Sequence, residues 1–167
     1  WPNKNTPIQE TLKALNELKD DGLIKATGVS NFTINHLKDA LDTEYDFSGN
    51  QVEFHPSLNQ QKLKQFCDKN DIHLTAYSPI AQGQDLNLEI IKDLAEKYCK
   101  PECQVILNWL IQQGLSAIPR SSNLEHIREN FETTNWSLDE DDINKINTKT
   151  KGLSNRLINP GFNEFDY

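Results

Sequence analysis

The sequence of 167 residues contains no methionine, only three cysteines and no apolar run near the roughly 20 residues that a membrane-spanning helix needs. Sparse cysteines in odd number are typical of reduced thiols rather than of a disulfide framework, so we expect a cytoplasmic protein with no membrane partner. Cys99 and Cys103 lie one helical turn apart. No histidine pair accompanies them at ligand spacing, so we predict no metal site. Because Trp1 stands where methionine is usual, we expect a piece of a longer protein.

Positively charged residues are also fewer than negatively charged ones. Lys and Arg number 17 against 25 Asp and Glu, which gives a net charge of -8. An acidic surface repels phosphate backbones, so we do not expect a nucleic-acid partner. A local basic pocket for one small anion remains compatible with this charge. The length and the 36% of hydrophobic residues suit one globular domain with a core.

Apolar periodicity predicts strands that alternate with helices. Thr6 and Gln9 form a capping box that predicts a first helix ending at Gly22, and Ser137 with Glu140 predicts another such start. Short apolar runs that stop at polar residues or proline predict four strands, over residues 23–29, 51–54, 72–77 and 115–118. Alternating strands and helices with short connections predict a parallel α/β sheet.

The helices carry apolar faces at three- and four-residue spacing. Leu124, Ile127 and Phe131 mark the helix that follows the last predicted strand. The helix after Thr33 presents Leu37 and Leu41 in the same way. The acidic run 139–142 lies in the first turn of the last helix, where the helix dipole favours it, so we expect a solvated terminus.

Polar side chains stand where each predicted strand ends, and parallel α/β proteins bind ligands at that edge of the sheet. Arg120, Ser121, Ser122 and Asn123 precede a helix. A cation, hydroxyls and a helix N-terminus together suit a phosphate group. The alternative is that Ser122 or Asn123 only caps the helix while Arg120 is solvated. Both interpretations remain open at this point.

Other signals point away from familiar sites. No G-x-G-x-x-G follows a strand, which argues against a Rossmann dinucleotide site. Gln51, Glu53 and His55 alternate along one strand. A lone histidine there is more often structural than a general base, so we predict no catalytic role for His55.

The strand ends carry motifs that resemble the aldo-keto reductase family in order and spacing. They are Gly28-Val29-Ser30-Asn31-Phe32, Asn50-Gln51-Val52-Glu53, Ala76-Tyr77-Ser78-Pro79 and Ile118-Pro119-Arg120-Ser121, completed by Glu129-Asn130-Phe131. Ala81-Gln82-Gly83 and Asn155-Arg156-Leu157 resemble the bacterial 2,5-diketo-gluconate reductase type. The resemblance implies an α/β fold of the TIM-type (β/α)8 barrel, with residues 1–167 as the C-terminal part of one domain: the last four β/α units, a helix and a tail.

The resemblance also implies an NADPH site, with NADH as a possible substitute. Ser30, Asn31 and Gln51 would hold the nicotinamide carboxamide, and Tyr77 would stack on its ring. Ser78, Ile80 and Gln82 would line the pyrophosphate path. The residues Arg120, Ser121, Ser122, Asn123 and His126 would surround the 2′-phosphate, with Glu129 and Asn130 on the adenine. Trp1 would line the substrate pocket.

The sequence departs from the family pattern at two places. Arg120 stands where lysine is usual, which keeps the cation, and His126 stands where arginine is common. Because a histidine side chain is mostly uncharged near neutral pH, we expect a relaxed choice between NADPH and NADH. The family's catalytic Asp, Tyr, Lys and His belong to the first half of the barrel. None of Tyr45, Tyr77, Tyr98 or Tyr167 takes the place of the acid, so we predict no catalytic residue in this chain.

The resemblance predicts an oxidoreductase that reduces small aldehydes or ketones, keto-sugars among them, by hydride transfer from NADPH. The chain alone is expected to be inactive. The alternative is a non-catalytic half-barrel that binds a nucleotide or a protein, with self-association through its open sheet edges. A third possibility, a phosphate-binding barrel enzyme of another class, is disfavoured by Ser30-Asn31 together with Tyr77.

Overall fold

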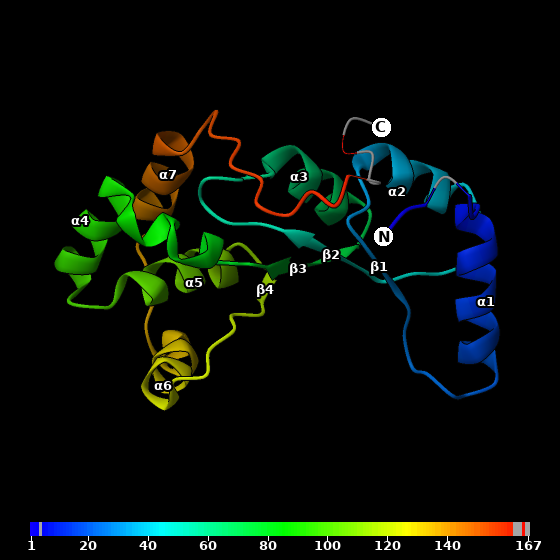
Figure 1. The fold of residues 1–167 in the computed structure, drawn as a ribbon, viewed down its shortest axis with the longest axis horizontal. Helices are drawn as coiled ribbons and strands as arrows, with labels where there is room; N and C mark the ends of the chain where they lie inside the picture. The colour runs from blue at the N-terminus through cyan, green and yellow to red at the C-terminus, as the bar shows by residue number, and fades with distance from the viewer. Residues whose placement is uncertain (4, 162–164, 166–167) are drawn as a thin grey trace. The chain divides into compact units, whose positions relative to one another are not determined.

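The computed structural model describes residues 1–3, 5–161 and 165 (Figure 1). Seven α-helices alternate with four strands in the described ranges. The strands are β1 (Gly28–Ser30), β2 (Gly49–Glu53), β3 (His73–Tyr77) and β4 (Ser116–Ala117). The helices are α1 (Ile8–Asp20), α2 (Ile34–Leu41), α3 (Gln61–Lys69), α4 (Glu89–Tyr98), α5 (Glu102–Gln112), α6 (Leu124–Glu132) and α7 (Glu140–Lys149). Short 3-10 turns occur at η1 (Ala81–Gly83), η2 (Asp85–Asn87) and η3 (Thr133–Asn135).

The strands follow one another in the sheet order β1-β2-β3-β4. β1 and β2 are parallel, with Ser30 opposite Gln51. Gly28 allows their close approach, because a Cβ there would lie 3.1 Å from the carbonyl oxygen of Gly49. Helices stand between consecutive strands in the sequence, so the predicted parallel α/β architecture is confirmed.

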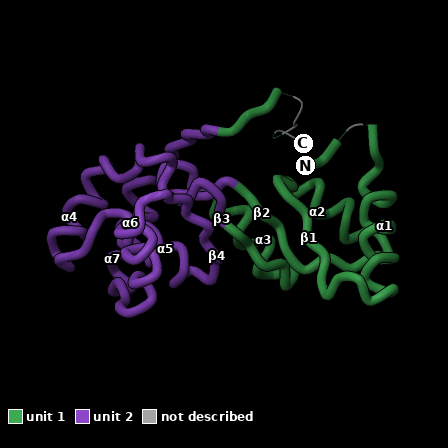
Figure 2. The backbone as a smooth tube through the Cα atoms, turned by 60° about the horizontal axis from the view of Figure 1, so that its bottom comes forward, with its two compact units in different colours: residues 1–52, 60–75, 158–167 green, residues 53–59, 76–157 purple. Residues whose placement is uncertain are grey.

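The chain forms two compact units, which are described separately (Figure 2). Unit 1 comprises residues 1–52, 60–75 and 158–167, and unit 2 comprises 53–59 and 76–157. In unit 1, α1 packs against α2, and Leu12, Leu37 and Cys67 are fully buried. In unit 2, α5 packs against α4, α6 and β4, with Trp109 fully buried and its ring 5.9 Å from that of Phe54. The prediction of one domain stays a prediction.

Two of the predicted helix starts are wrong. α1 begins after Pro7, so Pro7 rather than Thr6 is the N-cap residue and no side chain caps the helix; the Thr6 N–H donates to the carbonyl of Asn3 in a turn. α7 begins after Asp139 rather than at Ser137. A tertiary hydrogen bond replaces the capping box expected from Ser137 and Glu140: Tyr98 Oη accepts the N–H of Asp139 at 2.9 Å. Local sequence could not predict these partners.

Other boundaries differ for similar reasons. The strand expected over 23–29 is confined to Gly28–Ser30, and Leu23 is 71% exposed. The N–H groups of Leu23 and Ile24 donate to Leu18 O, so these residues wrap the end of α1. Gly22 has the expected positive φ of 72°. The start of α2 at Thr33 is confirmed, with a capping box formed by Thr33 and His36.

The expected apolar faces are only partly buried. Leu37 is buried in α2, but Leu41 is 42% exposed. In α6 no residue is buried: Leu124 is 61%, Ile127 47% and Phe131 79% exposed. The helix predicted at these residues is present as α6, and its apolar face is exposed.

Candidate functional site

The end of β1 brings together the three residues expected to hold a carboxamide in unit 1. Ser30 Oγ donates to the carbonyl of Gln51 at 3.0 Å, and the N–H of Asn31 donates to the same oxygen at 2.9 Å. Asn31 Nδ2 donates to Ser30 Oγ at 3.1 Å. Asn31 is buried, whereas the side chain of Gln51 is exposed. The three residues form one polar cluster with both donor and acceptor groups.

Asn50 positions this cluster, although sequence analysis gave it no role. Its Oδ1 accepts the N–H of Phe32 at 3.3 Å, and its Nδ2 donates to the carbonyl of Phe32 at 2.9 Å. The Asn50 side chain is buried. It therefore fixes the backbone directly after Asn31, which has a φ of 57°. In the sequence, the indication of this role was the position of Asn50 next to Gln51 in the motif Asn50-Gln51-Val52-Glu53.

A cavity of about 490 Å³ adjoins the cluster within unit 1. Its lining includes Trp1, Ser30, Phe32 and Gln51. Trp1 is 43% exposed, and its ring meets that of Phe165 edge-on at 6.1 Å. The cavity thus combines an aromatic wall with polar groups, and the substrate-pocket role of Trp1 stays a prediction.

The loop after β3, in unit 2, holds unusual backbone conformations. Ser78, Ala81 and Gln82 have φ values of 47°, 50° and 53°. Together with Asn31, they make up four of the six described non-glycine residues with positive φ. Such conformations each cost about 1 kcal/mol or more and gather at binding sites. This loop is the expected pyrophosphate path.

The side chains along that loop differ in exposure. Tyr77, Ser78 and Ile80 are half-buried, and Gln82 is exposed. The carbonyl of Ser78 accepts the N–H of Ala81 at 2.9 Å, which closes the turn. The loop thus presents an aromatic ring, a hydroxyl and an amide in succession.

The start of α6 shows both features that the sequence left open. Asn123 caps the helix, with Oδ1 accepting the N–H of Glu125 at 2.9 Å. Ser121 Oγ accepts the N–H of Asn123 at 3.1 Å, and Arg120 and Ser122 are exposed. Ser121 Oγ also donates to the carbonyl of Asn123 at 3.3 Å, so capping leaves the cation of Arg120 and the hydroxyl of Ser122 beside the helix N-terminus. This donor set fits a phosphate monoester.

The remaining predicted contacts lie further along α6. His126 is exposed, and Glu129 and Asn130 are half-buried. The carbonyl of Glu129 accepts a hydrogen bond from Gln104 Nε2 in α5 at 2.8 Å. The predicted residues of unit 2 thus fall on the end of β3 and the loop after it, on the segment before α6, and on α6 itself.

Unit 2 also buries a charged cluster that the sequence did not predict. His55 Nδ1 lies 3.1 Å from Asp85 Oδ2, and His55 Nε2 lies 3.2 Å from Glu53 Oε1. All three side chains are buried. Ser57 Oγ donates to Asp85 Oδ1 at 2.6 Å, which commits its proton and leaves no nucleophile. The alternating Glu53 and His55 were the only sequence signal.

Hydrogen bonds set the charges in this cluster. Burial disfavours the imidazolium form, but the hydrogen bonds to Asp85 and Glu53 outweigh it and raise the pKa of His55. Burial likewise disfavours the carboxylate of Asp85, yet its bonds with His55 and Ser57 lower the pKa. The cluster is therefore a buried, charged structural site.

The same cluster anchors the tail after α7. The N–H of Leu157 donates to Glu53 Oε1 at 2.8 Å, and Arg156 Nη1 lies 3.8 Å from Glu53 Oε2. The N–H of Asn155 donates to the carbonyl of Ser57 at 2.9 Å. The tail is thus held by backbone and charge, and Tyr167 lies outside the described residues.

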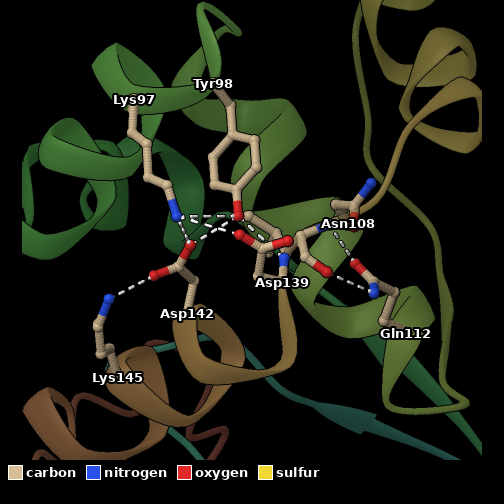
Figure 3. A network of polar contacts seen from close by, with 8 residues as sticks. Lys97, Tyr98, Asn108, Gln112, Asp139, Asp142 and Lys145 are labelled. Carbon is tan, nitrogen blue, oxygen red and sulfur yellow. Dashed lines mark hydrogen bonds and ion pairs between the residues drawn. The ribbon is translucent and has the colours of Figure 1, made fainter.

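A second network joins α4 to α7 (Figure 3). Tyr98 Oη donates to Asp142 Oδ2 at 2.6 Å, and Lys97 and Lys145 pair with the same carboxylate. Asp142 is fully buried, so the expectation of a solvated acidic terminus is wrong there. Lys97 and Tyr98 of α4 and Lys145 of α7 bond its carboxylate, and sequence periodicity does not reveal these partners.

This network resembles a catalytic Tyr-Lys-Asp set only in composition. Burial and the hydrogen bond to Asp142 raise the pKa of Tyr98, so the phenol holds its proton more tightly. Burial opposes ionisation of Asp142, but hydrogen bonds from Lys145 and Lys97 lower its pKa. A tyrosine that acts as a general acid needs the opposite, a phenol pKa lowered toward the working pH. The network links helices rather than forming an active site.

The described residues contain no group of three or more His, Cys, Asp or Glu side chains arranged to hold a metal ion. No helix in the described part of the chain is long and apolar enough to cross a membrane.

Comparison with known proteins gives one family. Residues 1–151 match the model of the aldo/keto reductase family. The chain is 42% identical over 152 residues to glyoxal reductase of Bacillus subtilis (strain 168), covering 90% of this chain and 55% of that protein. It is 44% identical over 144 residues to aldose reductase C of Dictyostelium discoideum, covering 84% of this chain and 45% of that protein.

Solved structures agree with this comparison. A crystal structure of a mutant of Gox0644 in complex with NADPH matches with a TM-score of 0.86 and 35% identity, covering 93% of this chain and 58% of that chain. A putative 2,5-diketo-D-gluconic acid reductase B matches with a TM-score of 0.90 and 27% identity, covering 97% of this chain and 58% of that chain. The chain therefore spans about half the length of the proteins it matches.

Proposed function

The chain belongs to the aldo/keto reductase family, and we propose that it supplies the cofactor-binding part of an enzyme that reduces small aldehydes or ketones, keto-sugars among them, with NADPH. The reductase names of its relatives and the NADPH complex of a structural neighbour support this proposal. NADPH supplies a hydride to the carbonyl carbon when bound. The chain's own residues bind and orient the two reactants.

Unit 1 would hold the nicotinamide end. Ser30, Asn31 and Gln51 offer hydroxyl and amide groups, which match the donor and acceptor of a carboxamide. Asn50 keeps this cluster in place through Phe32. Trp1 would form one wall of the substrate pocket in the adjoining cavity.

The remaining cofactor contacts are assigned to residues of unit 2. Tyr77 would stack on the nicotinamide ring, and Ser78, Ile80 and Gln82 would follow the pyrophosphate. Arg120, Ser121, Ser122, Asn123 and His126 would bind the 2′-phosphate, with Glu129 and Asn130 against adenine. The single observation that carries the proposal is Arg120 beside the Asn123-capped start of α6, because this arrangement suits a phosphate monoester.

The chain alone is expected not to turn over. Reduction needs a proton donor for the developing alkoxide. Tyr98 is engaged by Asp142, and Tyr77 is assigned to stacking. Catalytic Asp, Tyr, Lys and His would have to come from outside this sequence.

Binding of 2′,5′-ADP and 5′-AMP to the chain, compared by calorimetry, tests the proposal directly. We expect 2′,5′-ADP to bind about tenfold or more tightly, since a charge-assisted contact to phosphate is worth about 1.5–3 kcal/mol. Arg120→Ala should remove most of this difference. Arg128→Ala is the matched control, because Arg128 is exposed on α6, the helix that follows Arg120, and pairs with Glu125. Equal binding of both nucleotides by the unmodified chain would refute the 2′-phosphate assignment.

The second candidate, a non-catalytic half-barrel that binds a nucleotide or a protein, is favoured by one observation. Leu124, Ile127 and Phe131 expose an apolar face on α6. Contiguous exposed apolar surface is typical of interaction sites. Size-exclusion chromatography of the chain separates the candidates: a compact, stable dimer favours the binding module, and aggregation favours a part of an enzyme.

A further inference from the structure

α5 carries a row of three polar side chains at four-residue spacing: Gln104, Asn108 and Gln112. This spacing places them along one face of the helix. Gln104 is 3% and Asn108 2% exposed. Buried amides are stable only when their donors and acceptors are bonded, so the partners of this row are informative.

The row bonds mainly to backbone groups in the segment 129–138. Gln104 Nε2 donates to the carbonyl of Glu129 at 2.8 Å, and its Oε1 accepts Trp136 Nε1–H at 3.0 Å. Asn108 Nδ2 donates to the carbonyls of Thr133 and Trp136 at 3.0 and 2.8 Å. Gln104 is thus the member of the row that reaches α6.

The last member of the row acts further along the chain. Gln112 Oε1 accepts the N–H of Leu138 at 2.7 Å, and Gln112 Nε2 donates to the carbonyl of Leu138 at 3.0 Å (Figure 3). Both groups of Gln112 therefore hold the approach to α7. Gln104 and Gln112 carry the same amide but restrain different elements.

Apolar packing restrains α6 only weakly in unit 2. None of its residues is buried, and Leu124 and Phe131 are more than half exposed. Helix position in proteins normally comes from burial of an apolar face. Where that burial is absent, a buried hydrogen bond from the neighbouring helix carries more of the restraint.

We propose that Gln104 is a positioning residue for the adenosine end of the dinucleotide, acting through the backbone of Glu129. This inference rests on the proposed function, which places the adenosine contacts along α6 from Asn123 to Asn130. Because a helix moves as a rigid element, displacement of α6 at Glu129 displaces Asn123 and His126 as well. Gln104 also bonds Trp136, so it couples the position of α6 to the turn that follows it.

The test uses the full chain and calorimetric binding of 2′,5′-ADP. Gln104→Met keeps the length of the side chain but removes its donor and acceptor. We expect the dissociation constant to rise about tenfold, as the loss of one ordering hydrogen bond implies. Gln112→Met is the matched control, since it makes the same change on the same helix without touching α6.

Melting temperature separates positioning from a general loss of stability. Both variants are expected to lower it, Gln104→Met by more because Gln104 is buried and Gln112 is exposed, whereas only Gln104→Met should weaken binding. Gln104→Glu keeps an acceptor for Trp136 but cannot donate to Glu129, so it should weaken binding too, and it serves if Gln104→Met fails to fold. Wild-type affinity in a folded Gln104 variant, or equal weakening in Gln112→Met, would overturn the inference. If the unmodified chain binds no 2′,5′-ADP, both the proposed function and this inference fail.

Discussion

His55 Nδ1 lies 3.1 Å from Asp85 Oδ2, and neither side chain is more than 2% exposed. The other ring nitrogen faces Glu53 Oε1. With both nitrogens bonded to carboxylates, the imidazolium form can donate twice. The folded protein therefore stabilises a positive charge in its interior.

Stability should depend on pH through His55. Its pKa is raised above the ordinary 6.5, so its contribution is complete below that value and is lost as the pH rises through the folded-state pKa. The lowered pKa of Asp85 has the opposite effect: its contribution is lost as the pH falls through its folded-state pKa. We expect the free energy of unfolding, measured with urea, to decline as the pH rises above about 6.5. His55→Gln should flatten this decline, and an unchanged slope would contradict the assignment.

Tyr98→Phe should destabilise unit 2. The change removes the hydrogen bond to Asp142 and the acceptor for the N–H of Asp139. Hydrogen bonds to charged groups are worth about 1.5–3 kcal/mol, so we expect a loss of roughly 2 kcal/mol in urea unfolding. Tyr45→Phe is the control, since it makes the same change in unit 1. A loss as large in Tyr45→Phe would show that the network in Figure 3 is not the cause.

His126→Arg should sharpen the preference for a 2′-phosphate. His126 is exposed in the first turn of α6, and arginine would add a permanent positive charge there. We expect the affinity ratio of 2′,5′-ADP to 5′-AMP to rise roughly three- to fivefold, as suits an exposed ion pair. Glu132→Gln changes the net charge equally at the far end of α6. An equal rise in that variant, or none in His126→Arg, would rule out a local role for this position.

The strain at Gln82 should depend on the residue there. Its φ of 53° is accessible to glycine but costly for a β-branched residue. Gln82→Val is expected to lower the free energy of unfolding by about 1–2 kcal/mol, whereas Gln82→Gly should stay within about 0.5 kcal/mol of the parent. Similar losses in both variants would mean that the side chain of Gln82, rather than its backbone conformation, matters.

The sequence predicted the features that depend on neighbours along the chain. The stop at Gly22 and the start at Thr33 follow from backbone conformation and local capping, and both are present. The polar ends of β1 and β3 were predicted because apolar runs stop at Ser30 and Tyr77. These signals need only a few adjacent residues.

Features that depend on tertiary partners were missed. Asp142 was expected in solvent because its run is acidic, but Lys97, Tyr98 and Lys145 surround it. Ser137 loses its capping role because α5 and Tyr98 bond the following backbone groups. Periodicity marks the apolar face of α6, but it does not reveal whether a partner covers that face. The roles of the cofactor residues stay predictions.

The burial of α5 has a consequence for measuring stability. Seven consecutive residues, from Gln104 to Leu110, are buried. Their amide hydrogens can exchange with deuterium only when the surrounding structure opens, so they should be the slowest to exchange in unit 2. Exchange there would report the opening free energy of this unit separately from unit 1. A ligand that binds unit 2 would then reveal itself as slower deuterium uptake in α5, without any assay of catalysis.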